Sequence, residues 1–374
     1  MKKRLGRTAL LLTATLIFTG CAATKLTISD TDRPASGASP LAATVPLTKL
    51  DLAPNPREHI GESTAQIADA RIEPVSTDPA TDLPAQVVSK DKAADLTVNV
   101  TDTSRVIAMD LSGSIAATVW GLGFGDTLVG VDQSSTFPGT EDIPVVTSGG
   151  HTVNAESVIS RKPTLVITDG SVGPRDVVEQ LRDVGITVVF VNNDSSFEGA
   201  EQLARDVAAV FGAPEAGELL AQRISTEVQA KIAEIASIAP SNPSERVRML
   251  FLYVRGNAGV YYLFGEESGA DRLIEGIGGI DVAGELGWDG FRPMTDEAMI
   301  AADPDLILVM TKGIASVGGV DGLLQTKPAI ALTRAGKHRR FVDMEDGQIL
   351  SFGPRSALVL DALARAVYAP TSTT

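Results

Sequence analysis

Apolar and polar positions alternate in two ways along the chain from residue 105 onward. Short runs of β-branched and aliphatic residues predict buried strands: RVIAMD, TLVGVD, TLVITD and ITVVFV. Stretches with helical apolar spacing predict amphipathic helices, several closed by glycine: SIAATVWGLG, AESVISR, RDVVEQLRDVG and FEGAEQLARDVAAVFG. Strands that alternate with helices are typical of a parallel sheet, so we expect an α/β lobe over residues 103–213.

A long helical pattern follows this lobe. Pro214 suits a first helical turn, and the pattern EAGELLAQRISTEVQAKIAEIASIA then continues to Pro240. A helix over residues 214–239 is long enough to span a domain. The alternation resumes over residues 240–370, with strands at RMLFLYV, VYYLF and DLILVM and helices at ADRLIEGIGG and SALVLDALARAVY. The sequence therefore predicts two Rossmann-like α/β lobes joined by one long helix.

The two predicted lobes contain a similar segment. NAESVISRKPTLVI in the first and TDEAMIAADPDLILV in the second share a glutamate, Glu156 or Glu297, followed by an apolar pair and a proline. In each segment a short polar residue, Asn154 or Thr295, is placed to cap a helix whose first turn holds the glutamate. Two related lobes leave a cleft between them, and clefts at domain interfaces are where small ligands usually bind.

The N-terminus has the pattern of an exported protein. Basic residues come first, then the apolar run ALLLTATLIF and small residues before Cys21, which predicts a secretory signal peptide over residues 1–20. The apolar run is too short for a membrane span. The segment FTGC resembles a bacterial lipobox, in which the cysteine becomes the lipid-modified first residue, although Phe18 stands where leucine is usual. The alternative is a plain signal peptide that leaves a free thiol.

A flexible linker is expected after the signal peptide. Residues 21–102 are rich in Thr, Ala, Pro, Asp and Ser and contain almost no aromatic residues. Burial cannot offset the entropy of ordering such a composition, so we expect a disordered tether that holds the folded part away from a membrane. Residues 95–100 are a candidate edge strand, and His59 is expected in a solvated loop.

The overall composition excludes several classes of function. The net charge is -15 and no basic face is evident, so nucleic acid is not an expected partner. Cys21 is the only cysteine, which excludes an intramolecular disulfide and a cysteine-rich zinc site. The chain has no Gly-x-Ser-x-Gly elbow, and GLGFGD follows a helical pattern rather than a strand. We therefore expect a binding protein and not an enzyme.

His151, Tyr253 and Arg255 are candidate binding residues. His151 is one of three histidines and follows two glycines in SGGHTVNAE, where a core role is not expected. Tyr253 and Arg255 are two apart in LYVRG, so in a strand they project from the same face. The alternatives are a turn residue for His151 and an ordinary core tyrosine for Tyr253. His338, in the basic turn GKHRR, is expected to have no specific role.

These features together resemble the substrate-binding proteins of ABC importers for iron-siderophores, cobalamin and haem, over residues 103–370. More narrowly, GGHTVNAESV, LYVRG and SFGPRS resemble motifs of the haem-binding lipoproteins of bacterial haemin importers, the HmuT type. The resemblance implies the class III periplasmic-binding-protein architecture, with haem b as the transported ligand. His151 and Tyr253 would be axial ligands of the haem iron, Arg255 the partner of the tyrosine and Met310 a residue that lines the pocket.

The resemblance also implies partners at the membrane. Glu156 and Glu297 would dock onto arginines of the ABC permease, which works with an ATPase subunit. Acyl chains on Cys21, palmitate among them, would anchor the protein on the extracytoplasmic face of the cell membrane. Other cell-surface haem-binding proteins are further candidate partners there.

Haem coordination explains why these residue types suit the task. Ferric haem accepts imidazole and tyrosinate as axial ligands, and a nearby guanidinium favours the phenolate. We therefore expect Arg255 to hydrogen-bond the phenolate oxygen of Tyr253. A ferric siderophore or cobalamin remains the alternative cargo, since a siderophore arrives with its iron already coordinated. Arg175 and Arg292 are candidate contacts of the haem propionates.

Overall fold

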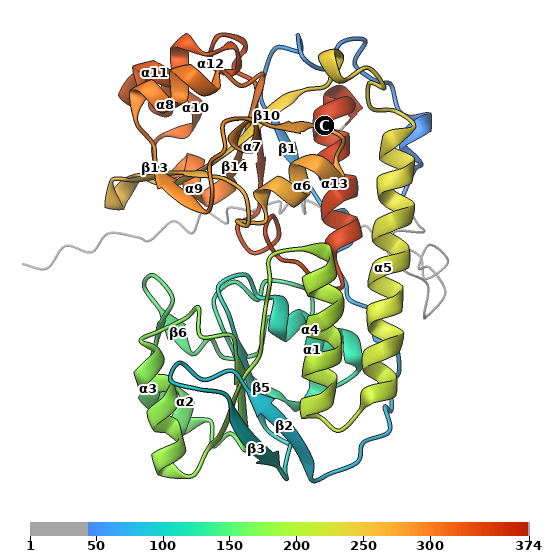
Figure 1. Ribbon diagram of the computed structural model, residues 1–374, viewed down its shortest axis with the longest axis vertical. Coiled ribbons are helices and arrows are strands. Elements are labelled where there is room, and N and C mark those ends of the chain that lie inside the picture. The colour runs from blue at the N-terminus through green and yellow to red at the C-terminus, as the bar shows by residue number, and fades with distance from the viewer. Residues whose placement is uncertain (1–43, 373–374) are drawn as a thin grey trace, which may run out of the picture. The chain divides into compact units, whose positions relative to one another are not determined.

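The computed structural model describes residues 44–372, which form two α/β lobes joined by the long helix α5 (Pro214–Ala236) (Figure 1). Pro214 occupies the start of α5, where its lack of a backbone N–H costs no helical hydrogen bond. Glu215 lies in the first turn, where the helix dipole favours a negative charge. α5 packs against α4 (Phe197–Val210) of the first lobe and against α13 (Ser356–Tyr368) near the end of the chain. The predicted fold class is confirmed, with the helix slightly shorter than expected.

The first lobe contains a parallel four-stranded sheet in the order β5-β4-β8-β9. Its strands coincide with the four predicted runs: β4 (Val106–Met109), β5 (Leu128–Val131), β8 (Leu165–Thr168) and β9 (Thr187–Phe190). Almost every strand residue is buried, which is why these runs are apolar throughout rather than alternating. The helices of this lobe are α1 (Ser114–Leu122), α2 (Ala155–Ser160), α3 (Arg175–Gln180) and α4.

Each strand of this sheet is followed closely by a polar residue at its carboxyl end: Asp110, Asp132, Asp169 or Asn193. Asp110 accepts the backbone N–H groups of Ser114 and Ile115 at 3.0 Å each, so it caps α1. Burial, and then the charge of Asp169, raises the pKa of Asp110 to about 6. Burial, and then the charge of Asp110, raises the pKa of Asp132 to about 8. This edge of the first lobe therefore holds two enclosed carboxyl groups that resist ionisation.

The second lobe contains a mixed sheet in the order β1-β15-β14-β10-β11-β13, with β12 paired to β10. The strands are β10 (Arg248–Arg255), β11 (Val260–Phe264), β12 (Ile280–Asp281), β13 (Phe291–Pro293), β14 (Leu306–Met310) and β15 (Phe341–Met344). β10 runs parallel to β14 but antiparallel to β11. The helices are α6 (Ala270–Gly276), α7 (Val282–Glu285), α8 (Asp296–Ala302), α9 (Thr311–Ala315), α10 (Gly319–Thr326), α11 (Pro328–Leu332) and α12 (Arg334–His338).

The segment before the first lobe corrects the prediction of a flexible linker over residues 21–102. From residue 44 the chain is packed, and Leu47, Ile72 and Val100 are buried. β1 (Ser63–Ala65) adds a parallel strand to β15, and β2 (Ala85–Ser89) pairs with β3 (Leu96–Val100) as a hairpin. Residues 95–100 therefore do contain a strand, as expected.

Backbone hydrogen bonds hold this segment against both lobes. Val75 N–H donates to the carbonyl of Gly121 in α1 at 2.8 Å, and Ala53 N–H donates to the carbonyl of Tyr368 in α13 at 2.7 Å. Backbone groups of any residue type make such bonds, so a polar composition does not reveal the order they impose. His59 is half-buried, and burial followed by the charge of Arg340 lowers its pKa.

The signal peptide, Cys21 and the rest of the predicted linker up to residue 43 lie outside the described residues. Within the part that the structure describes, no helix is long and apolar enough to cross a membrane.

Candidate functional site

His151 lies in the short loop between β6 (Thr147–Ser148) and β7 (Thr152–Val153) of the first lobe. Its φ is 63°, in the left-handed region that residues with a side chain seldom adopt. Gly150 precedes it at a φ of 81°, so consecutive residues are left-handed and the loop turns sharply. The carbonyl of His151 accepts the N–H of Gly173 at 3.3 Å, which fixes the turn to the next segment of the lobe. Backbone strain of this kind is typical of functional positions.

The imidazole of His151 is half-buried and uncommitted. Its Nδ1 atom is enclosed and has no hydrogen-bond partner among the described residues. Burial, and then the positive charge of Arg255, lowers the pKa of His151. Both effects favour the neutral imidazole, which is the form that binds metal ions. Arg255, whose charge contributes to this shift, belongs to the second lobe.

Tyr253 lies in β10, opposite Tyr262 of β11. Leu252 and Val254 are fully buried whereas Tyr253 and Arg255 are only partly buried, so the latter two share the other face of the strand, as predicted. The Tyr253 ring stacks on the ring of Phe264, with centroids 5.6 Å apart and planes 14° apart. This packing holds the tyrosine in a defined orientation.

Arg255 does not bind Tyr253 in the expected way. Its Cζ atom lies 4.4 Å from the centroid of the Tyr253 ring, so the guanidinium covers the ring face instead of donating to the phenol oxygen. Nη2 of Arg255 donates to Oδ2 of Asp346 at 2.8 Å and contacts Sδ of Met310 at 3.4 Å. Nη1 donates to the carbonyl of Val254 at 2.8 Å. A carboxylate that competes for the guanidinium explains the difference, because a charged acceptor binds it more strongly than a neutral phenol does.

Met310 and Asp346 complete this group in the second lobe. Met310 is the last residue of β14, is 8% exposed and contacts Arg255 as described above. Asp346 lies in the turn after β15, and its side chain is 15% exposed. Sequence reasoning missed Asp346. The only available signal was its place just past a strand that ends at the same sheet edge as β14.

Glu156 and Glu297 occupy equivalent positions in the two lobes. They lie in the first turns of α2 and α8, and both side chains are exposed. Asn154 accepts the N–H of Ser157 at 2.9 Å and Thr295 accepts that of Ala298 at 3.1 Å, as the predicted caps require. The structure therefore gives both lobes one similarly capped helix with an acidic first turn.

The remaining candidate residues are bound elsewhere. Arg175 donates to the carbonyl of Lys90 and covers the Phe190 ring at 4.3 Å from its centroid. Arg292 is exposed and lies 4.6 Å from the centroid of the Trp288 ring. His338 is 3.9 Å from Glu58. Each of these contacts stays outside the group formed by His151, Tyr253 and Arg255.

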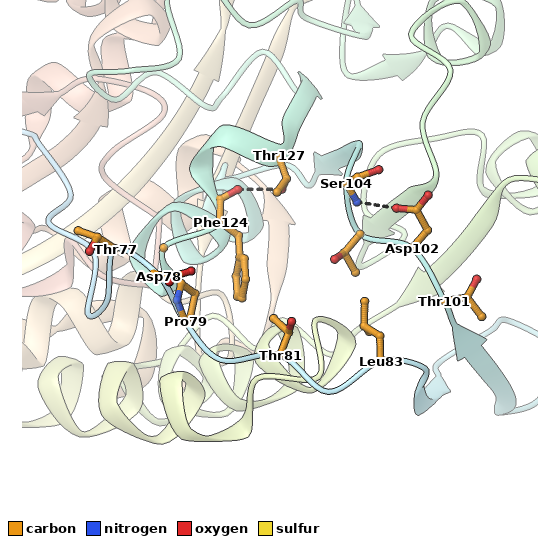
Figure 2. Close-up of a pocket in the computed structure, with 12 residues that line it drawn as sticks. Thr77, Asp78, Pro79, Thr81, Leu83, Thr101, Asp102, Ser104, Phe124 and Thr127 are labelled. Carbon is orange, nitrogen blue, oxygen red and sulfur yellow. Dashed lines mark hydrogen bonds between the residues drawn. The ribbon is translucent and has the colours of Figure 1, made fainter.

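A cavity of about 440 Å³ lies between the N-terminal segment and the start of the first lobe, and Figure 2 shows the side chains that line it. Within it the carboxylate of Asp102 accepts the N–H of Ser104 at 2.8 Å, and the Thr127 hydroxyl donates to the carbonyl of Phe124 at 2.8 Å. Neither His151 nor Tyr253 lines this cavity. Two of its polar groups are thus bound locally, and the imidazole of His151 lies elsewhere.

Residues 44–372 contain no group of three or more His, Cys, Asp and Glu side chains placed to hold a metal ion.

Comparison with known proteins places this site in context. The model of the family described as "Periplasmic binding protein" matches residues 110–346. The crystal structure of the heme-binding protein HmuT superposes with a TM-score of 0.78 at 38% identity, covering 84% of this chain and 99% of that chain. Similar crystal structures exist of HmuT variants in which a histidine, a tyrosine or an arginine is altered, the latter two being two positions apart.

Two curated relatives match at lower identity. The uncharacterized ABC transporter substrate-binding lipoprotein YvrC of Bacillus subtilis is 27% identical over 265 residues, which is 70% of this chain and 80% of YvrC. A cobalamin-binding protein of Halobacterium salinarum is 29% identical over 210 residues, which is 55% of this chain and 54% of that protein.

Proposed function

Because the chain belongs to the periplasmic binding protein family, we propose that it is an extracytoplasmic haem receptor that delivers haem to an ABC importer for iron acquisition. Members of this family and the structural neighbours of the chain are binding proteins of transport systems, so the expectation of a protein that is not an enzyme is confirmed. The observation that carries the haem assignment is the enclosed Nδ1 atom of His151, which has no hydrogen-bond partner among the described residues. Burial, and then the charge of Arg255 beside Tyr253, lowers the pKa of this histidine.

This pair of donors suits ferric haem. The porphyrin supplies four nitrogen ligands, so the protein needs to supply axial donors alone. A neutral imidazole from the first lobe and a phenolate from the second are both competent axial ligands. Met310, beside Arg255, would line the pocket next to them. The protein would thus bind haem b between the two lobes, with one ligand from each.

Similarity to HmuT supports the same assignment. The altered tyrosine and arginine of HmuT have the same two-residue separation as Tyr253 and Arg255 here. HmuT is described as a heme-binding protein, and nearly its whole length matches this chain.

Cobalamin is the second candidate cargo, because one relative is named as a cobalamin-binding protein. That match covers 55% of this chain, whereas the HmuT match covers 84% at higher identity. A neutral histidine is also a competent cobalt ligand, so the two cargoes are separated by experiment and not by His151 alone.

Membrane attachment and docking complete the proposal. Residues 1–20 would be removed as a signal peptide, and acyl chains on Cys21 would anchor the mature protein at the outer face of the cell membrane. A single acyl chain binds only marginally, so stable attachment requires more than one. Glu156 and Glu297 would contact basic residues of the permease, which the ATPase subunit drives. Other cell-surface haem-binding proteins are the proposed donors of the haem.

Titration of the purified chain from residue 22 with haemin, and separately with cobalamin, tests this function. We expect one haemin to bind per protein molecule, with a Soret band and the charge-transfer features of tyrosinate. Cobalamin should bind more weakly. Preferential binding of cobalamin, or no spectral change with haemin, would contradict the haem assignment.

A further inference from the structure

Asp346 binds Arg255 from a fixed position. Its Oδ1 accepts the backbone N–H of Lys312, at the start of α9, at 2.8 Å. Its Oδ2 accepts Nη2 of Arg255, also at 2.8 Å. Because one carboxylate oxygen is tied to the backbone of the second lobe, the other holds the guanidinium in a defined place.

The guanidinium of Arg255 is held over the face of the Tyr253 ring and away from the phenol oxygen. A hydrogen bond to the phenol oxygen requires a short and nearly linear approach of an N–H group to that oxygen. The Cζ atom of this guanidinium is 4.4 Å from the ring centroid, and each terminal nitrogen donates one hydrogen bond elsewhere, Nη2 to Asp346 and Nη1 to the Val254 carbonyl. The contact with Sδ of Met310 at 3.4 Å fixes the same nitrogen from another side.

Binding of ferric iron by Tyr253 would give Arg255 a second charged acceptor. An iron-bound tyrosine is a phenolate, and its oxygen becomes a charged acceptor close to a cation that already has a carboxylate partner. The two anions then compete for one guanidinium.

We propose that Asp346 is a positioning residue that competes with the iron-bound oxygen of Tyr253 for Arg255, and thereby speeds the release of haem. This inference rests on the proposed function. A receptor that delivers haem to a permease must bind the haem and also release it. Arg255 stabilises the bound phenolate, and the competing carboxylate of Asp346 limits that stabilisation. Asp346 itself does not contact the haem in this proposal.

Replacement of Asp346 by asparagine tests the competition. D346N keeps the size of the side chain and an acceptor for Lys312 N–H but removes the charge that holds Arg255. Haem transfer from the loaded protein to an excess of an apo haem-scavenging globin should slow by about 10-fold or more, the order of a charged hydrogen bond gained by the phenolate. The tyrosinate charge-transfer band should shift at the same time, which a purely structural effect on folding would not produce.

Three further variants make the test specific. D346E retains the charge and should release haem at the wild-type rate. E345Q removes the neighbouring acid, which contacts Lys312 and Thr136 but not Arg255, and should leave the rate unchanged. In an R255A background, D346N should have no effect, because the shared cation is gone.

Faster release from D346N, or an equal change in the R255A background, would overturn the role of Asp346 while leaving haem binding in place. Absence of haem binding by the wild-type protein would overturn the proposed function, and this inference with it.

Discussion

The two lobes present their candidate ligands in different ways. His151 is on a loop between strands of two residues each, with a left-handed backbone and an Nδ1 atom that has no partner among the described residues. Tyr253 is in the eight-residue strand β10, between β14 and β11 of the sheet, stacked on Phe264 and covered by Arg255. The candidate ligand of the first lobe is therefore uncommitted, whereas that of the second lobe is held by several contacts.

This difference indicates different roles for the two side chains. A tyrosine positioned by a sheet and an arginine can act as a fixed anionic anchor for ferric iron. An imidazole on a loop has fewer contacts to lose, so it is suited to join and leave as the cargo enters and departs. We expect the Tyr253 side to dominate affinity and the His151 side to shape the coordination.

The lobes are alike at Glu156 and Glu297, and breaking this likeness should have the largest effect on transport. Changing both residues to lysine places like charges against the proposed basic surface of the permease, so haem uptake by cells should fall to background. Haem binding by the purified variant should be unchanged, since both side chains are exposed and neither is a proposed ligand. Normal uptake, or lost haem affinity, would count against this role. E141K and E245K, on other parts of the surface, serve as charge-matched controls.

Removal of the anchor should have the largest effect on binding. Tyr253→Ala deletes the anionic ligand, and we expect haem affinity to fall by about 100-fold or more. Competition for haem with a reference globin gives the affinity. Tyr262→Phe, altered on the strand directly opposite, is the matched control and should bind as the wild type does. Comparable losses in the two variants would show that the sheet, and not the ligand, had been damaged.

Removal of the His151 imidazole should lower haem affinity less than removal of the Tyr253 side chain. His151→Ala should lower haem affinity by about 10-fold, because Met310 or water can take the vacated axial position. Its absorption spectrum should shift while much of the binding remains. A larger loss than in Tyr253→Ala would reverse the assignment of anchor and adaptable ligand. His338→Ala, which alters a histidine of the second lobe near Glu58, is the control.

The smallest expected effect concerns the pH dependence of stability, which should differ between the buried carboxyl groups of the two lobes. Asp305 of the second lobe is fully buried and paired with Arg57 and Arg334, whereas Asp132 of the first lobe is equally buried without an ion pair of its own among the described residues. Burial, followed by the charge of Asp110, raises the pKa of Asp132 to about 8. The folded state then binds protons more tightly than the unfolded state, so the free energy of unfolding should decrease as pH rises from about 4 to 8.

Thermal unfolding at pH 5 and pH 9 measures this dependence. Asp132→Asn removes the titrating group, so the difference in stability between the two pH values should shrink by at least about 1 kcal/mol, whatever the absolute stability of the variant. An unchanged pH dependence would show that Asp132 ionises without cost in the folded state.

The sequence predicted the regular elements well because their signals are local. Buried strands such as β8 and amphipathic helices such as α4 each carry their own periodicity, and Pro214 marks the start of α5. The shared segment around Glu156 and Glu297 correctly predicted both helix caps. Spacing alone also placed Tyr253 and Arg255 on one face of a strand.

The features that the sequence did not predict depend on contacts between residues that are distant along the chain. The order of residues 44–102 comes from pairing with elements such as β15, which a composition rich in Thr and Pro does not reveal. The position of Arg255 over the Tyr253 ring was not predicted, because it depends on Asp346, far along the sequence, which binds its guanidinium. An aspartate in a turn has no local pattern that distinguishes a binding partner from a solvated residue.

The central claim is that residues of both lobes bind one iron. Absorption and electron paramagnetic resonance spectra of the ferric haem complex test it most directly, recorded for the wild type, His151→Ala and Tyr253→Ala under identical conditions. We predict a six-coordinate wild-type spectrum with tyrosinate bands, loss of those bands in Tyr253→Ala, and their retention with altered coordination in His151→Ala. Identical spectra for all three proteins would contradict the claim and place the haem elsewhere.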